Sequence, residues 1–199
     1  MKLSGRLFVL FLGVFTLFVS GCGSGPSSSP ASISNNTWYN MSVSVPMDST
    51  NPRSCKMDVD VFPDPCSDGQ YLVDHTTSVS IALTRVDPYT DPGPLFLEKY
   101  TVDYIPSVPG SPIIPEMTVY QTLQLAEGGN TFQAVVMDVG RKQDFATLFA
   151  TDQYPQSILP VSYTAVFTFY GQNSYGQPWV FQAYAPIYVG EYNECVACS

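Results

Sequence analysis

The sequence predicts an all-β domain, built as a single antiparallel β-sandwich of seven to eight strands. Apolar and polar residues alternate with a period of two along eight separate runs, and such alternation is typical of strands that bury one face and expose the other. Tyrosine, phenylalanine, valine and threonine are abundant while lysine and glutamate are scarce, which favours strands over helices. Because no helix-length segment recurs between the runs, a sandwich is favoured over an α/β fold.

The predicted strands follow one another with clear breaks. The alternating runs are 39–45, 57–61, 79–84, 100–104, 119–125, 131–137, 163–170 and 179–189. Proline-rich loops are predicted at 63–65, 87–94 and 106–115.

Three further segments have distinct predictions. The Glu-Gly-Gly-Asn sequence at 127–130 lies between two runs and predicts a tight hairpin connection. Residues 171–176 predict a longer hairpin loop. A helix of one or two turns is predicted over 143–151, where Phe145 and Phe149 are spaced for one helical face.

The N-terminus has the features of an export signal over residues 1–21. Lys2 and Arg6 precede an apolar run at 7–19, which ends in Val-Ser-Gly before Cys22. About 13 apolar residues are too few for a membrane-spanning helix, which needs roughly 20.

The segment Val-Ser-Gly-Cys at 19–22 resembles the lipobox of bacterial lipoproteins. In a lipobox, a small residue before the cysteine lets the backbone enter a narrow protease site, and the cysteine thiol accepts diacylglycerol. The resemblance implies lipidation of Cys22 and attachment to the cell envelope. Gly23 after the cysteine implies the outer membrane if the cell is Gram-negative. The alternative is an ordinary secretory signal that leaves Cys22 as a thiol.

The remaining chain divides into a tether and a domain. Residues 22–35 are mostly glycine, serine and proline and predict a flexible tether, whereas 36–199 predict the β-sandwich. Without Lys2 and Arg6, six basic residues face seventeen acidic ones, which gives a net charge of −11. This charge argues against nucleic acid as a partner.

The segment Leu-Pro-Val-Ser-Tyr at 159–163 resembles the tyrosine corner of immunoglobulin-like and fibronectin type III domains. The resemblance implies that the Tyr163 hydroxyl bonds back to the loop that leads into its strand. It also implies that 58–62 run parallel beside 184–189. More broadly, the C-terminal half is similar to that of small lipoproteins of Gram-negative bacteria, which implies no particular activity.

Four cysteines remain besides Cys22, and an even number in an exported domain predicts two disulfides. The immunoglobulin-like resemblance favours Cys66–Cys195, which leaves Cys55 and Cys198 to pair or stay free. The rival pairing is Cys55–Cys66 with Cys195–Cys198. A zinc site built from the four thiolates is a further alternative.

The sequence marks no catalytic residue, metal site or cofactor site. His75 is the single histidine, and no Gly-x-Ser-x-Gly motif accompanies it. Two alternatives stay open: a hydrolase that uses paired carboxylates, and a calcium site near the first strand-to-loop junction. The candidate calcium ligands are Asp58, Asp60, Asp64 and Asp68.

Aromatic residues around the 171–176 loop are the remaining candidates for function. Tyr170, Tyr175 and Trp179 flank or lie within this loop and would bind a glycan or peptide if exposed. The alternative is that Trp179 and most tyrosines pack in the core. We therefore predict a non-enzymatic interaction or structural module, held to the membrane by its lipid and bound to an envelope protein.

Overall fold

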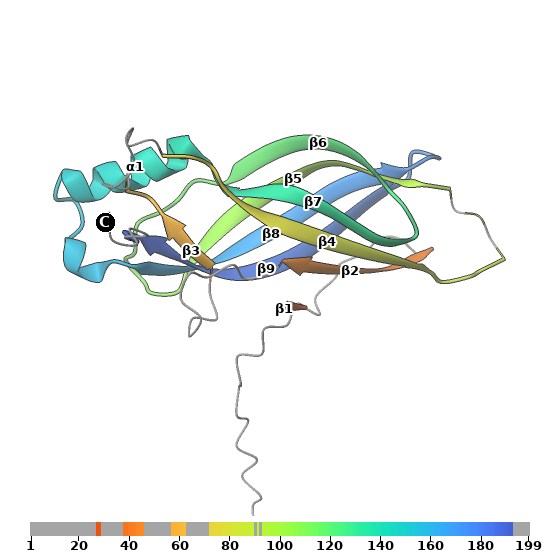
Figure 1. Cartoon of the computed structure of the whole chain (residues 1–199), viewed down its shortest axis with the longest axis horizontal. Helices are drawn as coiled ribbons and strands as arrows, with labels where there is room; N and C mark the ends of the chain where they lie inside the picture. The colour runs from red at the N-terminus through yellow and green to blue at the C-terminus, as the bar shows by residue number, and fades with distance from the viewer. Residues whose placement is uncertain are drawn as a thin grey trace, which may run out of the picture.

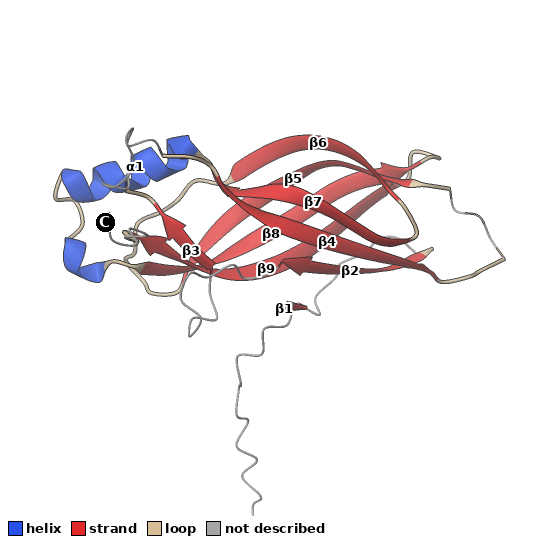
Figure 2. Ribbon diagram, viewed as in Figure 1, coloured by secondary structure: helices blue, strands red, loops and turns tan. Residues whose placement is uncertain are grey.

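The structure is a computed structural model that describes residues 27–28, 38–45, 57–62, 72–89, 91 and 93–192. It confirms the all-β prediction: these residues form two β-sheets and one α-helix (Figures 1 and 2). The elements are β1 (Ser27–Ser28), β2 (Tyr39–Val45), β3 (Met57–Asp60), β4 (His75–Arg85), β5 (Leu95–Pro106), β6 (Met117–Leu125), β7 (Gly128–Met137), α1 (Val139–Ala150), the 3₁₀ turn η1 (Gln156–Ile158), β8 (Val161–Asn173) and β9 (Pro178–Gly190).

The two sheets pack face to face. The first has the order β1-β2-β4-β7, and the second has the order β3-β9-β8-β5-β6. All pairs are antiparallel except β3 with β9. One sheet curls like half of a barrel, and the inner faces of both sheets fill the core. β1 falls inside the predicted tether, where its two residues pair with β2.

The parallel pairing of β3 with β9 confirms the expectation for 58–62 and 184–189. Met57 lies opposite Ile187 in the register, and Asp60 lies opposite Gly190. The Asp60 carboxylate then accepts the N–H of Phe62 at 3.1 Å and that of Tyr192 at 3.4 Å. This carboxylate therefore fixes the chain just beyond both strands.

Two tyrosines of β5 join the sheets across the core. The Tyr100 hydroxyl accepts the N–H of Val135 at 2.7 Å, and the Tyr104 hydroxyl donates to the carbonyl of Val136 at 2.6 Å. Both valines belong to β7, the edge strand of the opposite sheet. Burial favours the protonated hydroxyl and raises the pKa of both tyrosines. The edge of β7 is thus partly satisfied from within the molecule.

The predicted hairpin at 127–130 is wrong, because β6 and β7 belong to different sheets. β6 pairs with β5, and β7 pairs with β4. The short connection is closed by Asn130, whose amide accepts the N–H of Ala126 and donates to its carbonyl, both at 2.8 Å. Gly128 has a φ of +96°, which favours glycine. A tight turn between two strands has the same local chemistry whether the strands pair or separate.

The helix begins earlier than predicted, at Val139. Asp138 caps its N-terminus and accepts the N–H of Arg141 at 2.8 Å. Phe145 and Phe149 are buried beneath the helix, with ring centroids 5.2 Å apart. The helix therefore covers one end of the sandwich, as Figure 1 shows.

Tyr163 is buried as the tyrosine-corner resemblance implies, but its hydrogen bond goes elsewhere. Its hydroxyl donates to the carbonyl of Pro112 at 2.7 Å. Pro112 belongs to the β5–β6 loop and not to the approach to β8. The β5–β6 loop lies close because the N–H of Ser107 donates to the carbonyl of Ser162 at 2.9 Å. The expected hydrogen bond to the loop that leads into β8 is therefore wrong, and the Tyr163 hydroxyl bonds the β5–β6 loop instead.

Candidate functional site

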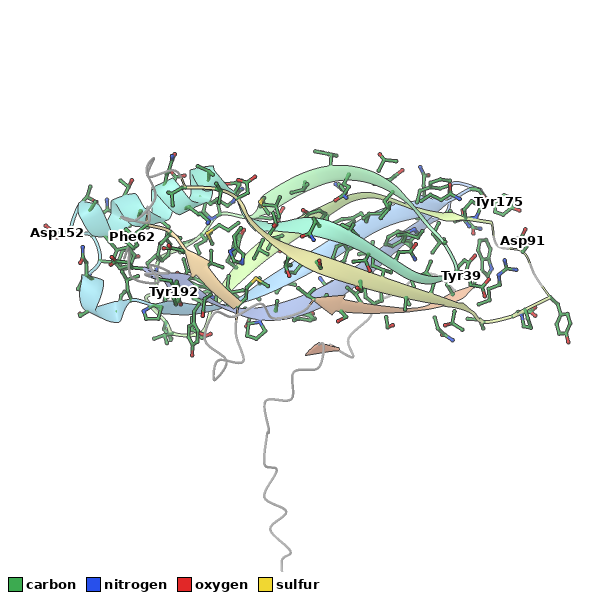
Figure 3. The ribbon with its side chains drawn as sticks, viewed as in Figure 1. Tyr39, Phe62, Asp91, Asp152, Tyr175 and Tyr192 are labelled. Carbon is green, nitrogen blue, oxygen red and sulfur yellow. The ribbon has the colours of Figure 1, made fainter. Side chains whose placement is uncertain are left out.

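The end of the sandwich away from α1 carries the candidate site, here called the loop end. It consists of residues 38–39, 85–89, 91, 93–94, 127 and 173–177. Tyr39, Asp91 and Tyr175 lie together there, while Phe62 and Tyr192 lie at the helix end (Figure 3). The loop end thus brings together the start of β2, the β4–β5 loop and the β8–β9 turn.

The β8–β9 turn is fixed by the side chain of Asn173. Its amide oxygen accepts the N–H of Tyr175 at 3.0 Å and that of Gln177 at 2.9 Å. The backbone adds two bonds, from the Asn173 N–H to the Gln177 carbonyl and from the Gly176 N–H to the Asn173 carbonyl, both 3.0 Å. Gly176 adopts a φ of +76° to complete the turn. The turn therefore holds one backbone shape, with Tyr175 at its tip.

The turn is also attached to the β4–β5 loop. The N–H of Ser174 donates to the carbonyl of Pro94 at 3.1 Å. The Tyr39 hydroxyl donates to the carbonyl of Gly93 at 3.1 Å, and the Gly93 N–H donates to Asp91 at 3.1 Å. A Cβ at Gly93 would lie 2.1 Å from the Ser174 hydroxyl oxygen, so the two loops touch at this glycine.

Aromatic side chains form the outer surface of the loop end. The Tyr175 side chain is 68% exposed and meets the Trp38 ring edge to face, with 6.4 Å between centroids. Tyr89 is 95% exposed. The carbonyl of Trp38 accepts the N–H of Val86 at 2.9 Å, which fixes the start of β2 against the loop. Rigid aromatic groups of this kind are favoured contact residues in binding surfaces.

Charged groups surround this surface. The Arg85 side chain pairs with Glu127 at 2.9 Å and lies 3.9 Å from Asp91. Burial raises the pKa of the Tyr39 hydroxyl, and the positive charge of Arg85 acts against this shift. Exposed ion pairs contribute about 0–1 kcal/mol to stability, so these pairs mainly orient the loops. Acidic groups outnumber the single guanidinium here.

The three predicted binding residues lie in three different environments. Tyr175 is exposed at the loop end, as a binding role requires. Trp179 is 1% exposed and packs in the core, as the alternative held, so it offers no surface to a ligand. Tyr170 is half-buried on the outer face of the second sheet, with the Lys99 ammonium 5.0 Å from its ring centroid.

Strand alternation explains this separation. β8 continues to Asn173, beyond its predicted end, so Gly171 is part of the strand and lies opposite Trp179. Gly171 and Trp179 face inward, and Tyr170 faces outward. Sequence reasoning also missed Trp38 and Tyr89. The only feature of the sequence that could have indicated them is that each is an aromatic residue close to the end of a strand.

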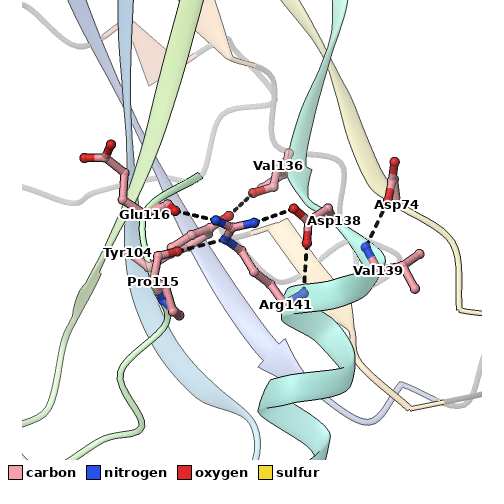
Figure 4. Close-up of polar contacts among 8 residues, drawn as sticks. All are labelled: Asp74, Tyr104, Pro115, Glu116, Val136, Asp138, Val139 and Arg141. Carbon is pink, nitrogen blue, oxygen red and sulfur yellow. Dashed lines mark hydrogen bonds and ion pairs between the residues drawn. The ribbon is translucent and has the colours of Figure 1, made fainter. Parts of the chain in front are cut away.

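A second polar cluster lies at the helix end around Arg141 (Figure 4). Its guanidinium donates to the carbonyl of Pro115 at 2.9 Å, to the carbonyl of Glu116 and to the Asp138 carboxylate. The Asp74 carboxylate accepts the N–H of Val139 at 2.9 Å. The Arg141 contacts attach α1 to the β5–β6 loop. The guanidinium thus has a structural role.

Other ionisable groups near α1 are separate from the loop end. Lys142 is 4% exposed, and burial lowers the pKa of its ammonium group, against the opposing charges of Asp60 and Asp74. His75 is the first residue of β4. Within the described ranges, no group of three or more His, Cys, Asp or Glu residues could hold a metal ion.

Several predicted residues lie outside the part of the chain that the structure describes. These are Cys22, Cys55, Cys66, Cys195 and Cys198, and the acids Asp64 and Asp68. Lipidation and the disulfide pairings therefore stay predictions. Among the described residues, no helix has the length and apolar character to cross a membrane.

Comparison with known proteins adds no relative: no family model, curated protein or solved structure matches the chain. The structure alone therefore defines the class of protein. It is a two-sheet β protein with exposed aromatic side chains on hydrogen-bonded loops at one end.

Proposed function

We propose that this protein is a lipid-anchored, non-enzymatic contact module that binds an envelope protein through its loop end. The observation that carries the proposal is Tyr175, an exposed aromatic residue on a turn that Asn173 holds in one shape. A site that is already ordered loses little conformational entropy on binding, which raises affinity. Tyrosine and tryptophan are among the residues that contribute most to protein interfaces.

The surrounding charges bear on the chemistry of the partner. Asp87, Asp91 and Glu127 lie around the aromatic surface, with Arg85 as the basic group among them. An acidic rim steers neutral or basic surfaces toward the site and disfavours acidic ones. The partner surface is accordingly an apolar patch with a neutral or basic rim.

The anchor sets where the contact takes place. Lipidation of Cys22 would hold the domain at the membrane through two or three acyl chains, each buried methylene contributing about 0.8 kcal/mol. Because residues 27–28 pair with β2, only residues 22–26 separate Cys22 from the sheet, and they reach on the order of 3.3 Å per residue when extended. The domain therefore works close to the lipid surface.

The sandwich is, on this proposal, of the immunoglobulin-like type. The strand orders β2-β4-β7 and β3-β9-β8-β5-β6 support it, as does the parallel pairing of β3 with β9. The bond from Tyr163 to Pro112 differs from the expected corner. Helix α1 between β7 and β8 is a further difference.

A glycan or a peptide is the second candidate ligand, and the exposed rings of Tyr175 and Tyr89 favour it. The face of a tyrosine ring can stack on a sugar, and its hydroxyl can form a hydrogen bond at the same time. A glycan would bind the isolated protein directly, whereas a protein partner would be found only among envelope proteins.

The decisive experiment places a photo-crosslinking residue at position 175 in the full chain and irradiates intact cells. We expect one envelope protein to crosslink, and Tyr175→Ala to reduce its co-purification at least tenfold. Ile113→Ala is the matched control, because Ile113 is 83% exposed but lies in the β5–β6 loop. Equal co-purification with Tyr175→Ala and wild type would refute the loop end as the contact surface.

The anchor has its own test. Cys22→Ser should release the protein from membranes and abolish labelling with palmitate. Continued membrane fractionation of this variant, together with labelling, would refute lipidation at Cys22.

A further inference from the structure

β6 forms an edge of the second sheet, and its pairing with β5 shifts in register between Leu97 and Lys99, at Gln121 and Thr122 of β6. It pairs with β5 on one side only. Its nine residues, Met-Thr-Val-Tyr-Gln-Thr-Leu-Gln-Leu, include no charged residue and no proline. Natural edge strands are usually short, charged, interrupted by proline or covered, because their free backbone groups pair readily with other strands.

The other described edges differ from β6. At the opposite edge of the same sheet, β3 has four residues, of which two are aspartates. β7 is long, but the hydroxyls of Tyr100 and Tyr104 bond its backbone at Val135 and Val136. No corresponding side-chain contact is present along β6 among the described residues.

The sequence of β6 is complementary to itself in the antiparallel direction. With Gln121 at the centre, Tyr120 of one strand lies opposite Thr122 of another, and Thr118 lies opposite Gln124. These four residues are all exposed, on the outer face. The same register places Val119 opposite Leu123, and Met117 opposite Leu125. Polar residues thus meet polar residues, and apolar residues meet apolar residues, on matching faces.

We propose that two copies of this chain associate by antiparallel pairing of their β6 strands around a two-fold axis at Gln121. Such an interface uses the same patch on both copies, and it joins the two five-stranded sheets into one continuous sheet. Val119, Gln121 and Leu123 are only half-buried in one copy, and the pairing covers them further.

Charge supports a second copy approaching at this strand. The chain has a net charge of −9, so most approaches bring acidic groups together and are unfavourable. The uncharged β6 avoids this repulsion. Its nearest acids along the chain, Glu116 and Glu127, lie just beyond the paired residues, so the association should strengthen as salt screens them.

The contact is small, and this sets its strength. Stable interfaces bury about 1,600 Å², more than one pair of strands provides, so the association is weak in dilute solution. Confinement on a membrane raises the effective concentration of the two copies. This last step rests on the proposed anchor, whereas the pairing itself does not.

A charge exchange tests the pairing. Two tagged forms of the full chain are reconstituted together in vesicles, and capture of one by the other is measured. Tyr120→Asp with Thr122→Asp places two like-charged pairs across the axis, and we expect capture to fall about tenfold. Tyr120→Lys with Thr122→Lys should reduce capture by the same factor. A mixture of the two variants should restore capture, because each aspartate then faces a lysine.

The register and the controls have separate readouts. Gln121→Cys should give a disulfide-linked dimer above the wild-type level, and Thr118→Cys should not, because Thr118 faces Gln124 across the axis. Val73→Asp is the control for added charge and should leave capture unchanged, because Val73 is 68% exposed and lies just before β4, in the other sheet. Thermal unfolding of each variant shows that the domain is folded.

Three results would overturn the proposal. These are absence of wild-type capture, both in vesicles and at high concentration in detergent, failure of the mixture to restore capture, and crosslinking of β6 to a different protein only. Equal co-purification of the envelope protein with Tyr175→Ala and with wild type would refute the proposed function and leave the β6 pairing intact, so the two failures are distinguishable.

Discussion

Gly171 is the position at which the smallest change should have the largest effect. It lies in β8 opposite Trp179. A Cβ at this position would lie 2.0 Å from the carbonyl oxygen of Phe96 and 2.4 Å from Cζ2 of Trp179. One neighbour is backbone in the middle of a sheet, and the other is a fully buried ring. Neither can move without displacing what surrounds it.

The expected cost of Gly171→Ala follows from this geometry. Overpacking a core typically costs about 1–3 kcal/mol, and occasionally more. Because both clashes at Gly171 are with fixed groups, we expect about 3 kcal/mol of lost unfolding free energy. With a slope near 2 kcal/mol per molar urea, the unfolding midpoint should fall by about 1.5 M.

Urea unfolding followed by tryptophan fluorescence measures this loss, because Trp179 is one of two tryptophans in the chain. Gly129→Ala is the matched control: no atom lies within 4 Å of a Cβ there, and its free energy should stay within about 0.5 kcal/mol of wild type. If Gly171→Ala lost less than 1 kcal/mol, the close contact between β8 and the Trp179 ring would be wrong.

Three further predictions follow from the buried polar groups. Tyr163→Phe leaves the carbonyl of Pro112 without its donor and should cost about 1–3 kcal/mol in urea unfolding, whereas Tyr120→Phe should change nothing. Burial raises the folded-state pKa of Tyr104 and Tyr163 above 10.0. The contribution of these two tyrosines to the free energy of unfolding is therefore complete below pH 10 and is lost as the pH rises from there through the raised pKa. When the free energy of unfolding is measured between pH 8 and 11, it should decline less steeply in Tyr104→Phe than in wild type. Asn173→Ala removes two bonds to backbone N–H groups, and should cost about 1–2 kcal/mol and weaken partner capture, although Tyr175 is still present.

Local patterns predicted the strands well, because burial of one face is a property of each strand by itself. The alternation in β2, β3 and β9 was visible in the sequence. The start of α1 was missed because its cap, Asp138, precedes the apolar residues that marked the helix. The ends of β4 and β5 were also missed, since paired neighbours extend a strand through residues whose own pattern is weak.

The candidate site was only partly predictable. Tyr175 lay in the predicted binding loop, and its exposure agrees with that hypothesis. Its fixed position depends on Asn173, which lies in the same turn, and on Pro94, which lies far away in the sequence and accepts the N–H of Ser174. Trp38 joins the surface from still farther away, and no local pattern relates these segments.

By itself, the sequence determined that this is an acidic, all-β protein with strands whose inner faces could be identified in advance, and it predicts a lipoprotein signal at the N-terminus. These properties follow from composition, short motifs and the two-residue repeat, which are all local. Only the tertiary structure decided that β6 and β7 separate into different sheets and that Trp179 is inside while Tyr175 is outside. It also decided that the edge of β7 is partly satisfied by two tyrosine hydroxyls, whereas no described side chain bonds the edge of β6. Each of these features depends on contacts between segments that are far apart in the sequence. The free energy of such a contact depends on both segments, so the local sequence of either segment cannot predict it.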